Sequence, residues 1–375
     1  SRGLGDVYKR QSKAGMSESL FRFAGACLGH RRGGVAMAAV GACAGFGAIC
    51  GSSLATAATM GRVALPELRR MGYSGSLSTG ALAAGGTLGI LIPPSVILII
   101  YSILTEQNIA KMFLAAFVPG ILAAIGYLLA IAIFVRIKPD SGPPTSYVGW
   151  RQRLNLFGQV WQILVIFFLV IGGIYLGWFT PTEGASIGAA GTGIMALFTK
   201  GFNFSDLIDV IKDTAVTSAM IFLVLLGAEF FNSFIALTQI TNELATFVIS
   251  NELSPYLVVF CILVLYIILG CLMDSLAMIL LTIPVFFPII IELDFGMSIE
   301  EVAIWFGILT LIVVEVGLIT PPVGLNVFII NKMAKNVPIS DTFIGVLPFL
   351  ISDLIRVGIL FIFPGISLFL IRLFG

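Results

Sequence analysis

The sequence predicts an all-α polytopic membrane protein built as an inverted repeat, in which each half contributes a re-entrant hairpin and a helix broken at a Pro-Pro pair. Three observations predict this architecture: an apolar composition, a one-sided distribution of basic residues, and a set of motifs that occurs twice. Apolar residues make up 58% of the 375-residue chain and charged residues only 11%, with a mean hydropathy of +1.06. Soluble domains carry about 25% charged residues, so this composition argues against a water-soluble fold.

The start of the chain does not belong to this pattern. Residues 1–11 (SRGLGDVYKRQ) are polar, contain no Met and join no helical pattern. We expect them to be a non-native segment, followed at 12–34 by the end of a truncated N-terminal region.

The first repeat is expected at 35–137 and consists of a re-entrant hairpin at 35–66, a broken helix at 76–104 and a helix at 113–137. A cytoplasmic loop at 138–155 and connecting transmembrane helices at 156–253 should follow it. A bilayer span needs about 20 apolar residues, so these runs are long enough to cross a membrane.

The second repeat is expected at 254–375 and consists of a re-entrant hairpin at 256–291, a broken helix at 302–331 and a helix at 343–371. The apolar run at 256–291 is too long for one helix and too short for two full spans, which favours a hairpin.

Basic residues segregate when these segments are threaded through a membrane from the cytoplasm. Thirteen of them then face the cytoplasm: Arg31, Arg32, Arg62, Arg69, Arg70, Arg136, Lys138, Arg151, Arg153, Lys200, Lys212, Lys332 and Lys335. Only Lys111 and Arg372 face outward, where six acidic residues gather: Glu243, Glu252, Glu292, Asp294, Glu300 and Glu301. This positive-inside bias holds only if both hairpins are re-entrant, because a full span in place of either one inverts everything after it.

Three ordered landmarks recur in the two halves. Gly89-Ile-Leu-Ile-Pro93-Pro94 matches Gly317-Leu-Ile-Thr-Pro321-Pro322, and Ser53-Leu-Ala upstream matches Ser275-Leu-Ala. Downstream, Pro119 and Pro348 follow their Pro pairs at nearly equal spacing. Because the charge pattern gives the two copies opposite orientations, the repeat is predicted to be inverted, with sites near the bilayer midplane.

The helix breaks and hairpin tips are the candidate sites. A Pro pair removes two backbone donors, and hydrocarbon cannot satisfy the groups freed in mid-membrane. Gly51-Ser52-Ser53 and Asp274-Ser275 add hydroxyl and carboxylate oxygens, which suit a hard cation such as sodium. In the opposing interpretation the Pro pairs are packing kinks and the serines bond into their own helices. The recurrence in both halves favours an ion or substrate site.

Other polar residues carry less information. Glu229 and Glu315 fall within predicted spans and are functional candidates by position, whereas Asp353 and Arg356 are spaced to neutralise each other on one helix face. The five cysteines lie in apolar stretches, and His30 is the only histidine, so no metal-ligand spacing occurs. A net charge of +1 gives no argument for nucleic acid; the expected surroundings are a lipid bilayer.

Five stretches resemble the large membrane subunit (DctM type) of tripartite ATP-independent periplasmic (TRAP) transporters: Gly51-Ser-Ser-Leu-Ala-Thr-Ala-Ala-Thr, Ala84-Gly-Gly-Thr-Leu-Gly-Ile-Leu-Ile-Pro-Pro-Ser, Trp178-Phe-Thr-Pro-Thr-Glu, Leu272-Met-Asp-Ser-Leu-Ala-Met and Gly317-Leu-Ile-Thr-Pro-Pro-Val-Gly-Leu-Asn. The resemblance runs from about Gly15 to the C-terminus. Family members begin with further N-terminal spans, which we expect to be missing here.

This resemblance implies an elevator-type carrier in the bacterial inner membrane that is driven by sodium and needs no organic cofactor. It implies three other participants: a small four-helix membrane subunit, a periplasmic substrate-binding protein and a small carboxylate substrate. It also implies a first sodium or substrate site at Gly51, Ser52, Ser53, Gly89, Pro93 and Pro94. The second implied site comprises Asp274, Ser275, Gly317, Thr320, Pro321 and Pro322.

Two alternatives remain open at this point. The first is a stand-alone sodium-coupled dicarboxylate or citrate carrier of similar design that needs no binding protein. The second is an intramembrane enzyme, which the sequence disfavours because it contains no HExxH and no paired intramembrane Asp motif. A phosphate-binding GxxxxGK[ST] loop is also missing from the sequence, so the chain itself should not hydrolyse ATP.

Overall fold

The computed structural model describes residues 16–198 and 204–374, so the expected non-native segment 1–11 lies outside them. In this part of the chain there are 17 α-helices, one short 3-10 helix and no strand, which confirms the all-α prediction. In chain order they are α2 (Met16–Leu28), α3 (Gly34–Cys50), α4 (Ser53–Arg70), α5 (Gly75–Leu91), α6 (Val96–Leu104), α7 (Ile109–Ile137), η2 (Pro139–Ser141), α8 (Trp150–Phe157), α9 (Trp161–Tyr175), α10 (Pro181–Phe198), α11 (Phe204–Thr238), α12 (Ile240–Ser250), α13 (Pro255–Gly270), α14 (Ser275–Ile291), α15 (Ile299–Gly317), α16 (Leu325–Met333), α17 (Ile339–Ile362) and α18 (Gly365–Phe374).

Helices α3 and α4 pack against each other as a hairpin because the residues at its tip end one helix and begin the next. Gly51 takes the left-handed conformation (φ 63°) that glycine tolerates, and its N–H bonds to Gly47 O at the end of α3. The Ser52 hydroxyl accepts the Ala55 N–H at 3.4 Å and caps the start of α4.

Helices α13 and α14 are arranged in the same way. The Asp274 carboxylate accepts the Leu276 N–H at 3.1 Å and caps α14. Ser52 and Asp274 are therefore both N-caps, and Ser53 and Ser275 are each the first residue of the second helix of a hairpin. This equivalence agrees with the repeat read from the sequence.

Each hairpin is followed by two helices separated at a Pro-Pro pair. Helix α5 ends at Leu91 and α6 begins at Val96, with a bend of 44° between them. Helix α15 ends at Gly317, and α16 begins at Leu325. The Pro93-Pro94 and Pro321-Pro322 peptide bonds are both cis.

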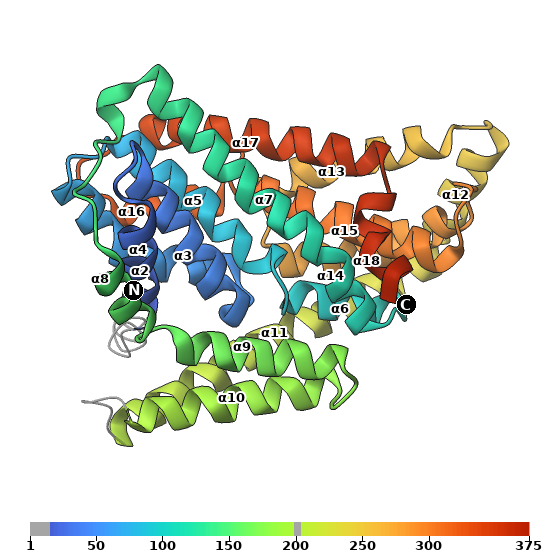
Figure 1. Cartoon of the computed structure of the whole chain (residues 1–375). Coiled ribbons are helices and arrows are strands. Elements are labelled where there is room, and N and C mark those ends of the chain that lie inside the picture. Colours follow the sequence, from blue (N-terminus) through green and yellow to red (C-terminus); the bar gives the residue numbers. More distant parts are fainter. Residues whose placement is uncertain (1–15, 199–203, 375) are drawn as a thin grey trace.

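The helices form an elongated molecule with distinct ends. Helices α7 and α17 run along its length, α3, α4 and α16 lie towards one end, and α6, α14 and α18 towards the other (Figure 1). Helices α9 and α10 pack as a pair along one side.

The length of the helices and their apolar surface are those of a membrane protein. In the described residues, three helices are long and apolar enough to cross a bilayer: α7, residues 207–238 of α11, and α17. Helices α5 and α6 together qualify as a fourth, bent span. Many large apolar side chains on α7, α11 and α17 are exposed, as expected for surfaces that face lipid.

Two segments differ from the sequence prediction. The single helix expected at 343–371 is divided, because α17 ends at Ile362 and α18 begins at Gly365. Pro364 explains this break, since a residue before proline is disfavoured in helix and Phe363 has φ −120° and ψ 74°. The loop expected at 138–155 contains η2 and the first residues of α8.

Candidate functional site

The two hairpin tips meet at one buried carboxylate. Glu315, near the end of α15, is 1% exposed. The Ser53 hydroxyl donates to Glu315 Oε2, and the Ser275 hydroxyl donates to Glu315 Oε1 at 3.0 Å. Both serines are buried. The carboxylate therefore connects the first hairpin, the second hairpin and the helix that leads into the second break.

The electrostatics of this meeting point are unusual for a membrane interior. Ser53 and Ser275 begin α4 and α14, so the positive N-terminal ends of both helices face Glu315. Within residues 16–198 and 204–374, the ion pairs all involve other carboxylates, and no basic side chain pairs with Glu315. A buried carboxylate without a cationic partner is costly unless it is neutralised by a proton or a cation.

Glycines allow the helices to cross closely beside each break. A Cβ atom added to Gly47 in α3 would lie 2.3 Å from the Cα of Gly89 in α5. In the second half, a Cβ atom on Gly317 would lie 2.5 Å from the Cα of Gly270 in α13. Each hairpin therefore touches its own broken helix, backbone against backbone, a few residues from its tip.

Backbone oxygens from the breaks approach the tips as well. A Cβ atom on Gly51 would lie 3.2 Å from Pro94 O, and the Cys271 thiol donates to Pro321 O at 3.2 Å. The Thr320 hydroxyl donates to Val316 O at 2.6 Å within its own turn, which leaves its lone pairs free to accept. Pro93 is buried, whereas Pro321 and Pro322 are exposed.

Asn326 adds an amide to the same region. It is fully buried in α16, its Nδ2 donates to Ala83 O at 3.2 Å, and a Cβ atom on Gly86 would lie 3.1 Å from that nitrogen and 3.2 Å from Ser53 O. Its Oδ1 is buried and has no hydrogen-bond partner in the described part of the chain. This oxygen is a further acceptor close to the first hairpin.

A second buried network occupies the first half. Thr87 lies two residues before Gly89, as Glu315 lies two before Gly317. Its hydroxyl is 2.8 Å from that of Tyr127, which donates to Asp353 at 2.7 Å. Asp353 pairs with Arg356 at 2.7 Å, which confirms that pair. The charges of Asp353 and Arg356 neutralise each other, so we interpret this network as structural.

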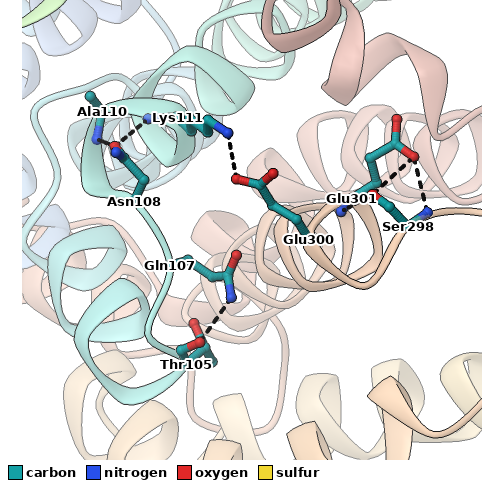
Figure 2. A network of polar contacts seen from close by, with 8 residues as sticks. All are labelled: Thr105, Gln107, Asn108, Ala110, Lys111, Ser298, Glu300 and Glu301. Carbon is teal, nitrogen blue, oxygen red and sulfur yellow. Dashed lines mark hydrogen bonds and ion pairs between the residues drawn. The ribbon is translucent and has the colours of Figure 1, made fainter. Parts of the chain in front are cut away.

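An ion pair joins the N-terminal ends of α7 and α15 (Figure 2). Lys111 pairs with Glu300 at 2.6 Å, and Arg372 of α18 pairs with Glu301 at 2.8 Å. Asn108 caps α7, and Ser298 forms a capping box with Glu301 at the start of α15. Both basic residues assigned to the outer side thus contact acidic residues assigned to that side.

Comparisons with known proteins identify the family of the chain. The family model described as "Tripartite ATP-independent periplasmic transporter, DctM component" matches residues 10–366. The chain belongs to the DctM family. It is 35% identical over 355 residues to the C4-dicarboxylate TRAP transporter large permease protein DctM of Pseudomonas aeruginosa, covering 94% of this chain and 81% of that one.

Other relatives are named for different substrates. The chain is 32% identical over 357 residues to the sialic acid TRAP transporter permease protein SiaT of Haemophilus influenzae, covering 95% of this chain and 56% of that one. It is 30% identical over 365 residues to the isethionate TRAP transporter permease protein DctMQ of Oleidesulfovibrio alaskensis, covering 95% and 55%. These relatives are named transporter permeases, and the chain is not an enzyme.

In this DctM-family chain the structure brings together only some of the residues that the sequence predicts for the two sites. Ser53 and Ser275 come together at Glu315, whereas Ser52 and Asp274 cap their helices, and Asp274 is exposed. The sequence singled out Glu315 only as an ionisable residue within a span, and gave no role to Asn326. The signal for Glu315 was its place two residues before the Gly317 break; Glu229, the other such candidate, is exposed on α11.

Proposed function

We propose that this chain is the large membrane subunit of a tripartite transporter of the bacterial inner membrane, in which a sodium gradient drives uptake of small carboxylates. Its partners in this proposal are a small four-helix membrane subunit and a periplasmic substrate-binding protein. The substrates for which the relatives are named, C4-dicarboxylate, sialic acid and isethionate, are all small anions and support an anionic cargo.

The observation that carries the proposal is the Glu315 carboxylate, buried between two hairpin tips without a basic partner. Sodium fits this setting because carboxylate, hydroxyl and carbonyl oxygens are the ligands that hard cations prefer. The Ser53 and Ser275 hydroxyls donate hydrogen bonds to Glu315, so the lone pairs of their oxygens are available to a cation. The carbonyls near Gly51 and Cys271 offer further oxygens from the breaks.

In this proposal, sodium binding is coupled to closure of the hairpin tips because the ion neutralises the Glu315 carboxylate. While Glu315 is charged and uncompensated, closing both tips around it is unfavourable, because the charge is removed from water without a counter-ion. A bound sodium ion supplies that counter-charge and favours the closed arrangement. Closed tips would then let the hairpins and broken helices move as one unit, as an elevator-type mechanism requires.

The experiment is uptake into proteoliposomes that contain the small membrane subunit and this subunit in full length. Uptake of labelled substrate should require an inward sodium gradient and the loaded binding protein outside. Omission of either one should reduce uptake to background. Robust uptake without the binding protein would instead identify a stand-alone sodium-coupled carrier, and uptake without sodium would refute the coupling ion.

A further inference from the structure

A cavity of about 980 Å³ lies at the ends of α4 and α16, away from Glu315. Five of its lining residues are basic, and they come from both halves of the chain: Arg62, Arg69, Arg70, Lys332 and Lys335. Asp341 also lines it, and Arg70 pairs with Glu67 at 2.7 Å. In the described residues, Arg69, Lys332 and Lys335 have no ion-pair partner, so the cavity carries excess positive charge.

A second, independent feature of the cavity also suits an anion. Ser78, which lines it, is 5% exposed, and its hydroxyl has no hydrogen-bond partner in the part of the chain that the structure describes. Ser78 lies in the first turn of α5, where the positive end of the helix dipole favours negative charge. A buried hydroxyl without a partner is a donor that a carboxylate or phosphate oxygen can accept from.

The cavity is connected to the candidate site by two helices. Helix α4 begins at Ser53, beside Glu315, and reaches the cavity at Gly61, which is about 12 Å further along at 1.5 Å per residue. Helix α16 carries Asn326 at one end and Lys332 at the other. At the cavity, a Cβ atom on Gly61 would lie 2.8 Å from the Ile330 side chain, so α4 and α16 are in close apolar contact there.

We infer that this cavity is an anion-binding vestibule on the exit route, where the carboxylates of the transported molecule bind after they leave the region of Glu315. The inference rests on the proposed function and adds a binding place for the same class of substrate at the cytoplasmic end. Several cations, a helix N-terminus and a free hydroxyl suit a small dianion better than a single carboxylate, because each added charge has its own partner.

The test uses proteoliposomes with the complete transporter and the loaded binding protein outside. Because the binding protein is present only outside, only transporters with their periplasmic side outward take up substrate. In these transporters the cavity faces the vesicle lumen. Succinate is sealed inside at increasing concentration, and the initial rate of uptake gives its half-inhibitory concentration. In Lys332→Gln/Lys335→Gln this concentration should rise by about fivefold or more, because each exposed ion pair is worth up to about a factor of five.

Two controls and a second test variant make the result specific. Lys332→Arg/Lys335→Arg keeps the charges and should restore the parent value. Arg136→Gln removes a basic residue from the end of α7, outside the cavity, and should leave the value unchanged. Ser78→Ala should raise the value in the same direction as the lysine variant, since it removes the free hydroxyl.

The outcomes separate this inference from the proposed function. If no variant transports and the parent also fails, the proposed function fails with it. If the parent transports and the lysine variant keeps the parent's half-inhibitory concentration, the vestibule is refuted while the proposed function stands. If inhibition instead follows the phosphatidylglycerol content of the vesicles and not succinate, the cavity holds a lipid headgroup, which contradicts a place on the exit route.

Discussion

Ser53 and Ser275, one from each repeat, donate hydrogen bonds to the two oxygens of the same buried carboxylate, that of Glu315. Each serine is the first residue of the helix that leaves a hairpin tip. The carboxylate therefore contacts both tips at once, and opening either tip removes one of its hydrogen-bond donors.

This arrangement predicts that the two serines are energetically coupled. Ser53→Ala and Ser275→Ala should each destabilise the protein by about 1.5–3 kcal/mol, the cost of losing a hydrogen bond to a charged group. The double variant should depart from the sum by at least about 0.5 kcal/mol, because both bonds end on one carboxylate. Thermal unfolding of the purified protein in detergent measures this, with Ser186→Ala on the exposed face of α10 as the control. Strictly additive shifts would contradict the shared carboxylate.

The glycine contacts predict a steric effect at the second break. Gly317→Ala should destabilise by about 1–3 kcal/mol, because its Cβ would lie 2.5 Å from Gly270 Cα and backbone cannot rotate away. Gly172→Ala in α9 is the matched control, since nothing lies within 4 Å of its Cβ. A melting temperature of Gly317→Ala equal to that of the parent would show that α13 and α15 do not cross this closely.

The buried ion pair predicts a different pattern. Asp353→Asn should destabilise by about 3–5 kcal/mol, because it leaves Arg356 buried without a counter-ion. Asp353→Leu/Arg356→Met removes both charges and should be far less harmful. If the single and double variants melt at the same temperature, the pair is not the neutralising unit described here.

The orientation of the chain is tested by labelling. In a background without the five native cysteines, Ser146→Cys and Glu292→Cys place single thiols at exposed positions. The positive-inside pattern predicts that Ser146→Cys is labelled only from the cytoplasm and Glu292→Cys only from the periplasm. Labelling of both from one side would refute the inverted repeat.

Much of this architecture could be predicted because it depends on local signals. Gly51 and the Pro pairs act through their backbone and the Ser52 and Asp274 caps through their side chains, and these local signals for helix ends are visible in the sequence. Phe363-Pro364 is a signal of the same kind, and the division of α17 from α18 could have been read from it.

The centre of the site could not be predicted in the same way. Glu315 lies 262 residues from Ser53 along the chain, and only packing brings them together. The equivalent position in the first half is Thr87, which bonds instead to Tyr127, so the repeat gives no second copy of the carboxylate. Asp274 stood out in the sequence because it is charged at a tip, yet capping accounts for its contact in the structure.

The most direct test of the account is the sodium dependence of uptake by Glu315→Gln in the reconstituted tripartite transporter. Glutamine keeps the shape and an acceptor for Ser53 or Ser275 but removes the charge, so the fold should survive while the cation loses its counter-charge. We expect the sodium concentration for half-maximal uptake to rise by at least about tenfold, equivalent to about 1.4 kcal/mol. Glu229→Gln, an exposed residue on α11, should match the parent. A Glu315→Gln transporter with the parent's sodium dependence would contradict the claim that sodium closes the two tips on this carboxylate.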